Sequence, residues 1–333
     1  MPALAPENLN FNPELERQFT KYIYSGNAKF NYYLSSQTEF DFGLSTEYID
    51  NDISGRGFII PAYKQYNLGA FAVAKHHFSK KSLLQAGLRY DFGHLHTFSY
   101  QDWFLSPTEE NGVSSNEYIE RAEEIQRNFS NLSWSVGFNY NPNKWSYKIN
   151  VGKSFRMPIA KELAANGVNY HRFSYEVGDA NLSPESSYQL DLGIAFNSKK
   201  FAFNLSPFVN YFSNYIYLNP TSNYDREYGF GNQVFEYSES KVLRLGSEIS
   251  IYYDFIKNFE LSFMGEYLYA QQLSGEKKGF TLPFSPPATG IFSLKYELPK
   301  LAFISDLYTS IDYKFTAAQN RIVPPEEKTA AYH

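Results

Sequence analysis

The feature that most constrains the fold is a strict two-residue alternation that recurs along the chain. In residues 188–197, YQLDLGIAFN, every second side chain from Tyr188 to Phe196 is apolar, and the residues between them are polar or small. Residues 131–140, NLSWSVGFNY, and 39–48, EFDFGLSTEY, repeat this pattern. Successive side chains of an extended chain point to opposite faces, so the pattern predicts strands with one apolar face.

About twelve segments follow this pattern, and several are much longer than the five or six residues of an ordinary globular strand. The predicted strands are 28–35, 38–50, 64–78, 82–98, 129–140, 145–155, 186–197, 201–218, 233–255, 259–270, 288–298 and 302–316.

Short and long connections alternate between these segments. The short ones are 35–37, 79–81, 141–144, 198–200, 257–258 and 299–300. The long ones are 51–63, 99–128, 156–185, 219–232, 271–287 and the tail from residue 317. In a meander this places all short turns at one edge and all long loops at the other, which is the layout of an up-and-down transmembrane β-barrel with periplasmic turns and extracellular loops.

Composition is compatible with that interpretation. Aromatic residues make up 19% of the chain, which suits half-buried pleated surfaces. The formal net charge of −5 argues against nucleic acid as a partner, and the absence of cysteine excludes disulfides and thiol chemistry. No apolar run reaches the ~18 residues of a membrane helix, and residues 1–10 show no signal-peptide pattern. The alternative is a soluble β-sandwich, which would need a second covering sheet, shorter strands and mixed loop lengths.

Two stretches predict short helices between strands. In SFRMPIAKEL, residues 154–163, Pro158 can begin a helical turn, because its missing N–H has no partner there, and Gly167 can end it. Residues 116–129 place Tyr118, Ile119, Ala122 and Ile125 on one side of a short amphipathic helix.

The block from 152 to 193 carries a family resemblance. It contains GKSFRMP, then EL, a glycine-containing loop, GDANLSPESS and an outgoing strand. In this order of motifs the chain resembles the TonB-dependent receptors, and nearly its whole length agrees, including GLRYD (87–91), GSE (246–248), LPFSPP (282–287) and AAQNR (317–321). The matching positions of the block are Gly152, Phe155, Arg156, Pro158, Glu162, Leu163, Gly178, Leu182, Pro184, Glu185 and Ser187.

The resemblance implies an outer-membrane receptor of a Gram-negative bacterium. Such receptors have a signal peptide, a TonB-contacting segment, an N-terminal plug and a barrel of about 22 strands. We therefore expect residues 1–333 to be part of the barrel domain, with about twelve of its strands and without the plug, the signal peptide or the last strands. Leu192 and Ile194 are expected to face lipid, and Gln189 and Asp191 the lumen.

The block also contains the candidate site residues. Arg156 can pair with Glu162 or Glu185 across the loop, while Pro158 and Pro184 stiffen its two ends, so these five residues are predicted to anchor it. Tyr170, His171 and Arg172 lie in the same long loop, where a ligand would arrive. We expect His171 to be an ordinary loop residue rather than a haem ligand.

The histidines predict neither a metal site nor a cofactor. His76 and His77 point to opposite faces of one strand, and His94 and His96 form a pair on one face that needs no metal to explain it. We found no nucleophile with its base, no paired catalytic carboxylates and no phosphate loop, so a non-enzyme is expected.

The resemblance implies TonB-dependent uptake of a scarce metal chelate, with ferric siderophore as the leading substrate. The implied partners are the TonB energy-coupling protein, the chelate and outer-membrane lipid. The alternatives are a haem or cobalamin receptor of the same family, a passive outer-membrane pore, and a soluble glycan-binding module.

Overall fold

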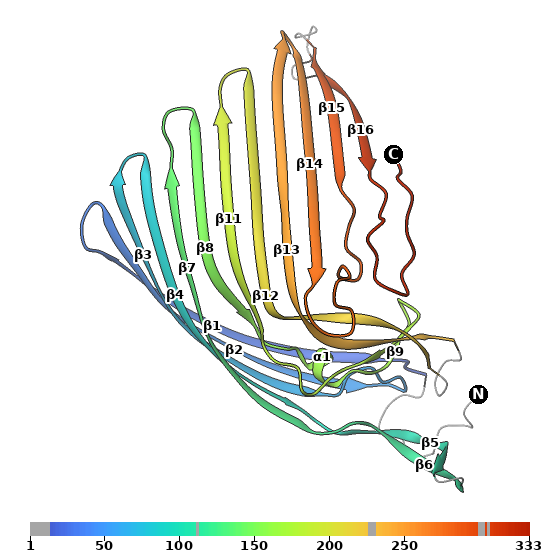
Figure 1. Ribbon diagram of the computed structural model, residues 1–333. Helices are drawn as coiled ribbons and strands as arrows, with labels where there is room; N and C mark the ends of the chain where they lie inside the picture. Colours follow the sequence, from blue (N-terminus) through green and yellow to red (C-terminus); the bar gives the residue numbers. More distant parts are fainter. Residues whose placement is uncertain (1–13, 111–112, 226–230, 299–303, 305–306) are drawn as a thin grey trace.

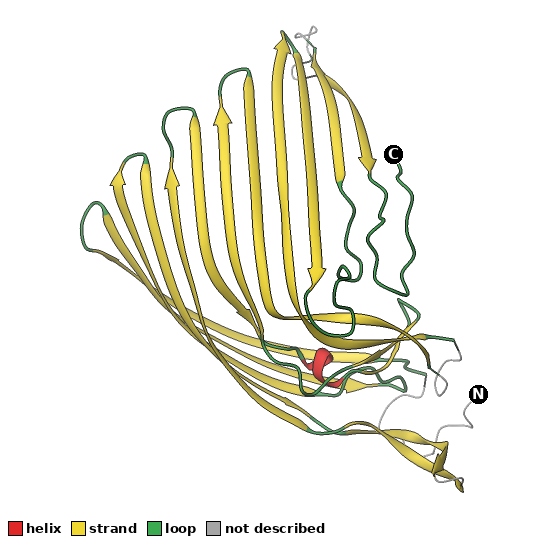
Figure 2. Ribbon diagram, in the orientation of Figure 1, coloured by secondary structure: helices red, strands yellow, loops and turns green. Residues whose placement is uncertain are grey.

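The alternating segments form one large antiparallel sheet in which neighbours along the chain are mostly neighbours in space (Figure 1). The computed structural model describes residues 14–110, 113–225, 231–298, 304 and 307–333. Twelve strands run through the sheet in chain order: β1 (Gln18–Tyr33), β2 (Thr38–Ser54), β3 (Tyr63–Ser79), β4 (Ser82–Thr97), β7 (Ile125–Tyr140), β8 (Trp145–Arg156), β11 (Glu185–Asn197), β12 (Phe201–Tyr224), β13 (Gln233–Ile256), β14 (Phe259–Gln272), β15 (Thr289–Glu297) and β16 (Tyr308–Thr316). The sheet is curved, and a short helix lies on its concave side (Figure 2).

The predicted strands are therefore confirmed, with corrections at their ends. β1 begins at Gln18 rather than at residue 28, and β12 continues to Tyr224. β16 begins at Tyr308 rather than at residue 302, and residues 302–303 and 305–306 of that predicted strand lie outside the described residues. The short turns after β1, β3, β7, β11 and β13 lie where the sequence predicts them, whereas the turn at 299–300 lies outside the described residues. Over the part of the chain that the structure describes, the sheet stays open, with β1 at one edge and β16 at the other.

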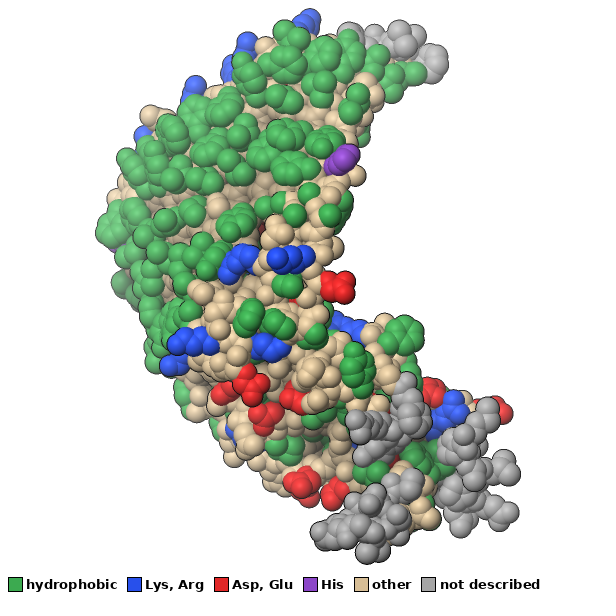
Figure 3. Space-filling model, turned by 45° about the vertical axis from the view of Figure 1, so that its right-hand side comes forward, with side chains coloured by type: hydrophobic (Ala, Val, Ile, Leu, Met, Phe, Trp, Pro, Cys, Tyr) green, Lys and Arg blue, Asp and Glu red, His purple; other side chains and the backbone are tan. Residues whose placement is uncertain are grey.

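The two faces of the sheet differ as the alternation requires. Apolar side chains such as Leu132 and Leu192 remain 46% and 39% exposed, and no second sheet among the described residues covers them, which rules out the sandwich. The opposite, concave face is polar: Gln189 donates to Asp191 at 2.7 Å, and Arg89 contacts Asp91 at 2.6 Å. Figure 3 shows the apolar side chains gathered over the upper part of the molecule.

Strand length indicates how the sheet meets a bilayer. β12 and β13 each have 24 residues, which at a rise of ~3.3 Å per residue reach about 80 Å, against a hydrocarbon core of ~30 Å. The surplus lies on the long-loop side, so these strands project beyond the membrane there. Among the described residues, none of the helical segments has the length and apolar character of a membrane span.

Four further strands belong to the long loops. β5 (Tyr100–Glu110) and β6 (Val113–Ala122) form a separate hairpin, so the helix predicted over 116–129 is wrong. β9 (Asn166–Asn169) pairs with β10 (Ser174–Val177), which pairs in parallel with residues 233–236 of β13.

Helix α1 (Ala160–Ala164) confirms the predicted helical turn but not its ends. Its N-cap is Ile159, so Pro158 precedes the cap and is fully buried instead of taking the first helical position. Gly167 lies in β9, beyond the helix. Glu162 accepts the Ile159 N–H at 3.0 Å, which satisfies one of the amides left unpaired at a helix start.

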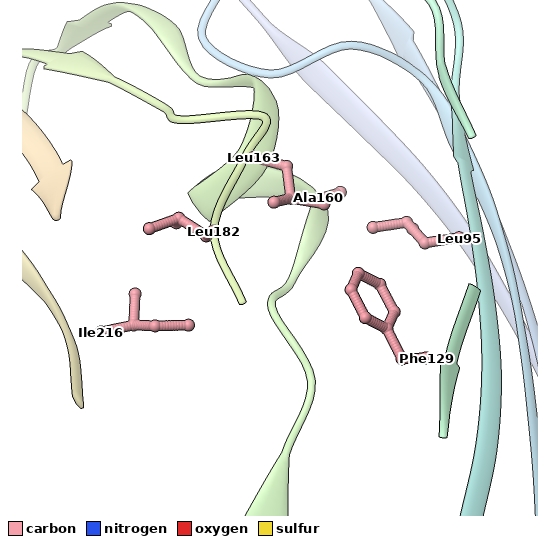
Figure 4. Packing of buried hydrophobic residues seen from close by; sticks show 6 residues of the cluster. All are labelled: Leu95, Phe129, Ala160, Leu163, Leu182 and Ile216. Carbon is pink, nitrogen blue, oxygen red and sulfur yellow. The ribbon is translucent and has the colours of Figure 1, made fainter. Parts of the chain in front are cut away.

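The helix is held on the concave side of the sheet by an apolar cluster. Leu163 and Leu182, from the two halves of the long loop, are 2% and 1% exposed. They pack together with side chains from the surrounding sheet (Figure 4). The buried members of the cluster are Leu95, Phe129, Ala160, Leu163, Leu182 and Ile216. Because Leu95 and Phe129 come from β4 and β7 and Ile216 from β12, the loop connects strands that are not adjacent in the sheet.

Candidate functional site

The loop between β8 and β11, residues 157–184, is the centre of the candidate site, and we call it the anchored loop. Arg156, the last residue of β8, contacts Glu162 at 2.8 and 3.0 Å and Glu185, the first residue of β11, at 3.2 Å. Glu185 also accepts the N–H of Ile216 in β12 at 3.0 Å. Arg156 therefore forms both of the predicted ion pairs, with Glu162 and with Glu185, at the same time.

The three charged side chains are shielded unequally from water. The side chains of Glu162 and Glu185 are 9% and 14% exposed, and that of Arg156 is 40% exposed. Burial alone would lower the pKa of Arg156, but the two carboxylates outweigh it and raise the pKa above its ordinary value. The guanidinium is thus a permanent charge that compensates two carboxylates.

A second buried carboxylate fixes the helix to the β9–β10 hairpin. Glu176 in β10 is fully buried, forms an ion pair with Lys161 in α1 and accepts a hydrogen bond from Asn169 at 2.7 Å. A buried carboxylate is costly unless it is paired and hydrogen-bonded, so these contacts define one arrangement of helix and hairpin.

Other strands hold the returning half of the anchored loop. Arg127 in β7 donates to the carbonyls of Ala180 and Leu182, the latter at 3.3 Å. Glu239 in β13 accepts the N–H of Ser183 at 3.0 Å, and Asn214 in β12 donates to the carbonyl of Pro184. These contacts join positions more than 25 residues apart in the sequence.

Two glycines allow the backbone segments of this region to approach closely. A Cβ on Gly167 would lie 2.1 Å from the carbonyl oxygen of Phe58 in the β2–β3 loop. A Cβ on Gly178 would lie 2.6 Å from the backbone nitrogen of Ala164. Neither backbone atom can give way as a side chain would, so glycine is required at both positions.

Beside the anchored loop lies an open pocket of about 920 Å³. Its lining comes from the start of β1, the β2–β3 loop, α1 and the β9–β10 hairpin. The residues are Glu16, Arg17, Phe19, Arg56, Ile59, Ile60, Lys161, Asn169, Tyr170 and His171. Of the three residues predicted to face a ligand, Tyr170 and His171 line this pocket, and Arg172 is exposed outside its lining.

The cations of the pocket are held in different ways. Arg17 donates to the carbonyls of Gly57 and Val168, at 3.2 and 3.0 Å, and lies 5.3 Å from the ring centre of Tyr170. Arg56 pairs with Glu16 at 2.7 Å and remains half-exposed. Burial, and then the neighbouring carboxylate of Glu16, raise the pKa of Tyr170, which keeps the phenol protonated.

Three of the remaining histidines have polar neighbours. His94 contacts Asn128 at 2.7 Å, and His96 contacts Glu124 at 2.8 Å. His76 contacts Thr38 at 2.9 Å. Among the described residues there is no group of three or more His, Cys, Asp or Glu side chains placed to hold a metal ion.

Sequence reasoning missed Arg17, Arg56 and Lys161 as pocket residues. Lys161 lies within the motif block and could have been examined there. Arg17 directly precedes β1 and Arg56 lies in the β2–β3 loop, and only the curvature of the sheet and the fold of the loops bring them to the hairpin.

The fold and its faces define a class of protein. The sheet is a meander with an apolar outward face and a polar concave face, and it has short turns at one edge and long loops at the other. This arrangement is typical of a transmembrane β-barrel of the outer-membrane type. A sequence model described as "TonB dependent receptor-like, beta-barrel" matches residues 5–333, and the chain belongs to the TonB-dependent receptor family. Members of this family are receptors and transporters in the outer membrane of Gram-negative bacteria.

Several solved structures have a similar fold. "Copper transporter OprC" aligns with a TM-score of 0.75 at 16% identity, over 95% of this chain and 49% of that one. A double mutant of the hemophore receptor HasR of Serratia marcescens, in complex with its hemophore HasA and heme, aligns with a TM-score of 0.62 at 17% identity, over 92% and 52%. The ferric yersiniabactin uptake receptor FyuA from Yersinia pestis aligns with a TM-score of 0.59 at 12% identity, over 95% and 45%. The chain thus spans about half the length of these structures, and at such identities the similarity shows the fold alone.

Proposed function

We propose that this protein is a receptor for TonB-dependent uptake of a metal chelate, and that the chelate is an anionic ferric siderophore. Its partners are then the TonB protein, the chelate and the surrounding lipid. The observation that carries the substrate class is the open pocket beside the anchored loop. Its volume falls within the ~300–1,000 Å³ typical of small-molecule sites.

The chemistry of the pocket suits an anionic, ring-containing ligand. Three cationic side chains line it; Arg56 pairs with Glu16 and Lys161 pairs with Glu176, so the positive charge of Arg17, which donates to backbone carbonyls, is left over. Tyr170 adds an aromatic surface, and Ile59 and Ile60 add apolar contact. A guanidinium fits planar oxygen anions well, and an aromatic ring can stack on the ligand.

Haem uptake is the second candidate, and His171 is the residue that favours it. His171 is exposed and lines the pocket, and its backbone N–H is hydrogen-bonded to Asn169 at 3.2 Å. A metal-binding imidazole is usually oriented through its second nitrogen by a carboxylate or carbonyl. No such contact of the His171 side chain is present among the described residues, so the siderophore proposal is preferred.

The test measures the binding of a ferric catecholate to the full-length receptor. Binding is monitored through the quenching of the receptor's fluorescence. Arg56→Gln removes a cation from the pocket and should weaken binding roughly tenfold, the loss expected when one charge-assisted hydrogen bond is removed. Lys278→Gln, at an exposed lysine outside the pocket lining, is the matched control. If both variants bound the chelate equally well, the pocket would not be its binding site.

Growth on the same chelate as sole iron source tests energy coupling. Uptake should require the TonB protein of the cell, because a receptor of this family is opened through TonB. Growth without TonB would instead support the passive pore.

A further inference from the structure

The short-turn edge of the sheet carries a local excess of positive charge, although the chain as a whole is acidic. Three consecutive turns, after β3, β7 and β11, contain five exposed lysines, Lys80, Lys81, Lys144, Lys199 and Lys200. No Asp or Glu occurs in residues 76–86, 138–150 or 194–206, which contain these turns and the adjoining strand ends. Figure 3 shows basic side chains along the upper left edge of the molecule with no acidic ones beside them, whereas both kinds occur in its lower part.

The three turns form one continuous surface. The N–H of Asn141 donates to the carbonyl of Lys81 at 2.7 Å, and the N–H of Asn197 donates to that of Lys144 at 2.8 Å. The ammonium of Lys81 also donates to Asn143 in the next turn, at 3.2 Å. We call this surface the lysine rim. None of its five lysines has an ion pair among the described residues.

Aromatic side chains fix the height of this rim in the bilayer. On the outward face, ring contacts continue from Tyr140 in β7 to Tyr296 in β15, with centroids 4.5–6.5 Å apart. The rings are Tyr140, Tyr147, Trp145, Phe196, Phe201, Tyr253, Phe255, Phe259 and Tyr296. Such a belt marks the boundary between hydrocarbon and headgroups.

The lysines of the turns after β7 and β11 lie immediately beyond this belt, and Lys81 precedes Ser82, which pairs with Tyr140 at the end of the belt. Lys144 precedes Trp145, and Lys200 precedes Phe201. A lysine next to an interfacial ring extends its ammonium into the headgroup layer, where lipid phosphates lie. The positive charge of the lysines and their position next to the aromatic belt therefore both favour a lipid phosphate as the ligand.

We propose that the lysine rim binds anionic phospholipid headgroups, such as those of phosphatidylglycerol, in the leaflet at the short-turn edge. The rim is a broad electrostatic surface rather than a closed pocket, so it selects lipid by headgroup charge. Each lysine near such a surface contributes about a fivefold preference.

The test is native mass spectrometry of the full-length receptor, released from micelles that contain phosphatidylglycerol and phosphatidylcholine in equal amounts. The ratio of phosphatidylglycerol-bound to phosphatidylcholine-bound receptor should exceed one. In the triple variant Lys80→Gln, Lys144→Gln and Lys199→Gln it should fall at least fivefold. Lys81 is kept in this variant because it links two turns.

The matched control replaces three exposed lysines of the long-loop side, Lys241→Gln, Lys278→Gln and Lys328→Gln, and should leave the ratio unchanged. A second measurement needs no variant: raising the ionic strength should lower the ratio for the unmodified receptor, because exposed charges are screened. An unchanged ratio in the turn variant, or an equal fall in the control, would overturn the proposal. So would loss of the preference when phosphate replaces acetate at equal ionic strength, since that result would indicate a site for small anions.

Discussion

Replacing Arg156 by alanine should loosen the anchored loop without unfolding the sheet. The substitution leaves Glu162 and Glu185 with no compensating cation, although each keeps one backbone donor, Ile159 and Ile216 respectively. Arg156 belongs to a mostly buried group of ion pairs that holds the loop closed. Its loss should therefore destabilise the closed state of the loop.

The magnitude follows from the exposures of the three side chains. Breaking a fully buried ion pair costs ~3–5 kcal/mol. Arg156 is 40% exposed, so water can replace part of the stabilisation that it gives the two carboxylates. The N–H groups of Ile159 and Ile216 still donate to these carboxylates and retain a further part of it. We therefore expect about 2 kcal/mol, which is roughly a thirtyfold increase in the equilibrium constant for loop opening.

Hydrogen exchange of the full-length receptor in detergent measures this change directly. Amides in residues 157–184 should exchange roughly thirtyfold faster in Arg156→Ala, while those of β2 and β3 keep their rates. Arg172→Ala, at an exposed arginine of the same loop, is the control. Adding Glu162→Gln and Glu185→Gln to Arg156→Ala should restore part of the protection, because the buried negative charges are then removed. Unchanged exchange in Arg156→Ala would refute the anchoring role.

Three further outcomes are expected. Leu192→Arg should cost ~2–4 kcal/mol in bilayers and Asp191→Arg far less, and equal folding yields would contradict the assigned facing. His171→Ala should show no selective loss of growth on haem as sole iron source; such a loss would make His171 a candidate axial ligand. The 333-residue chain expressed by itself should not yield a closed monomer in detergent, because lipid cannot satisfy the open edges of β1 and β16; a stable, heat-modifiable monomer would show otherwise.

The strands could be predicted because the bilayer imposes a simple rule on them. Between the short turns and the outer interface each residue faces either lipid or lumen, and strands such as β11 therefore alternate without interruption. Beyond the interface the rule no longer applies. The first ten residues of β1, from Gln18 to Asn27, contain Gly26 and Asn27, which look like a turn but pair with β2.

The loops could be predicted only where their partners lie close in sequence. Arg156, Glu162 and Glu185 stand at the two ends of one connection, so pairing among them could be expected from adjacent strands. The helix predicted over 116–129 failed because apolar residues three and four apart occur by chance in a twisted hairpin with irregular pairing. The parallel pairing of β10 with β13 joins residues 174 and 233, and no local pattern encodes such a contact.

The anchored loop is a fixed part of the sheet structure rather than a mobile lid, because it contacts several strands of the sheet. Its apolar cluster contacts β4 and β7 on one side and β12 on the other, and its polar contacts reach β7, β12 and β13. Opening it would break these contacts together and expose carboxylates that are paired only in the closed arrangement. The pocket residues Lys161, Tyr170 and His171 therefore rest on a fixed support, whereas Arg56, half-exposed in the β2–β3 loop, has more freedom to adjust to a ligand. A substrate that enters this pocket would meet a preorganised surface on one side, which reduces the conformational entropy lost on binding.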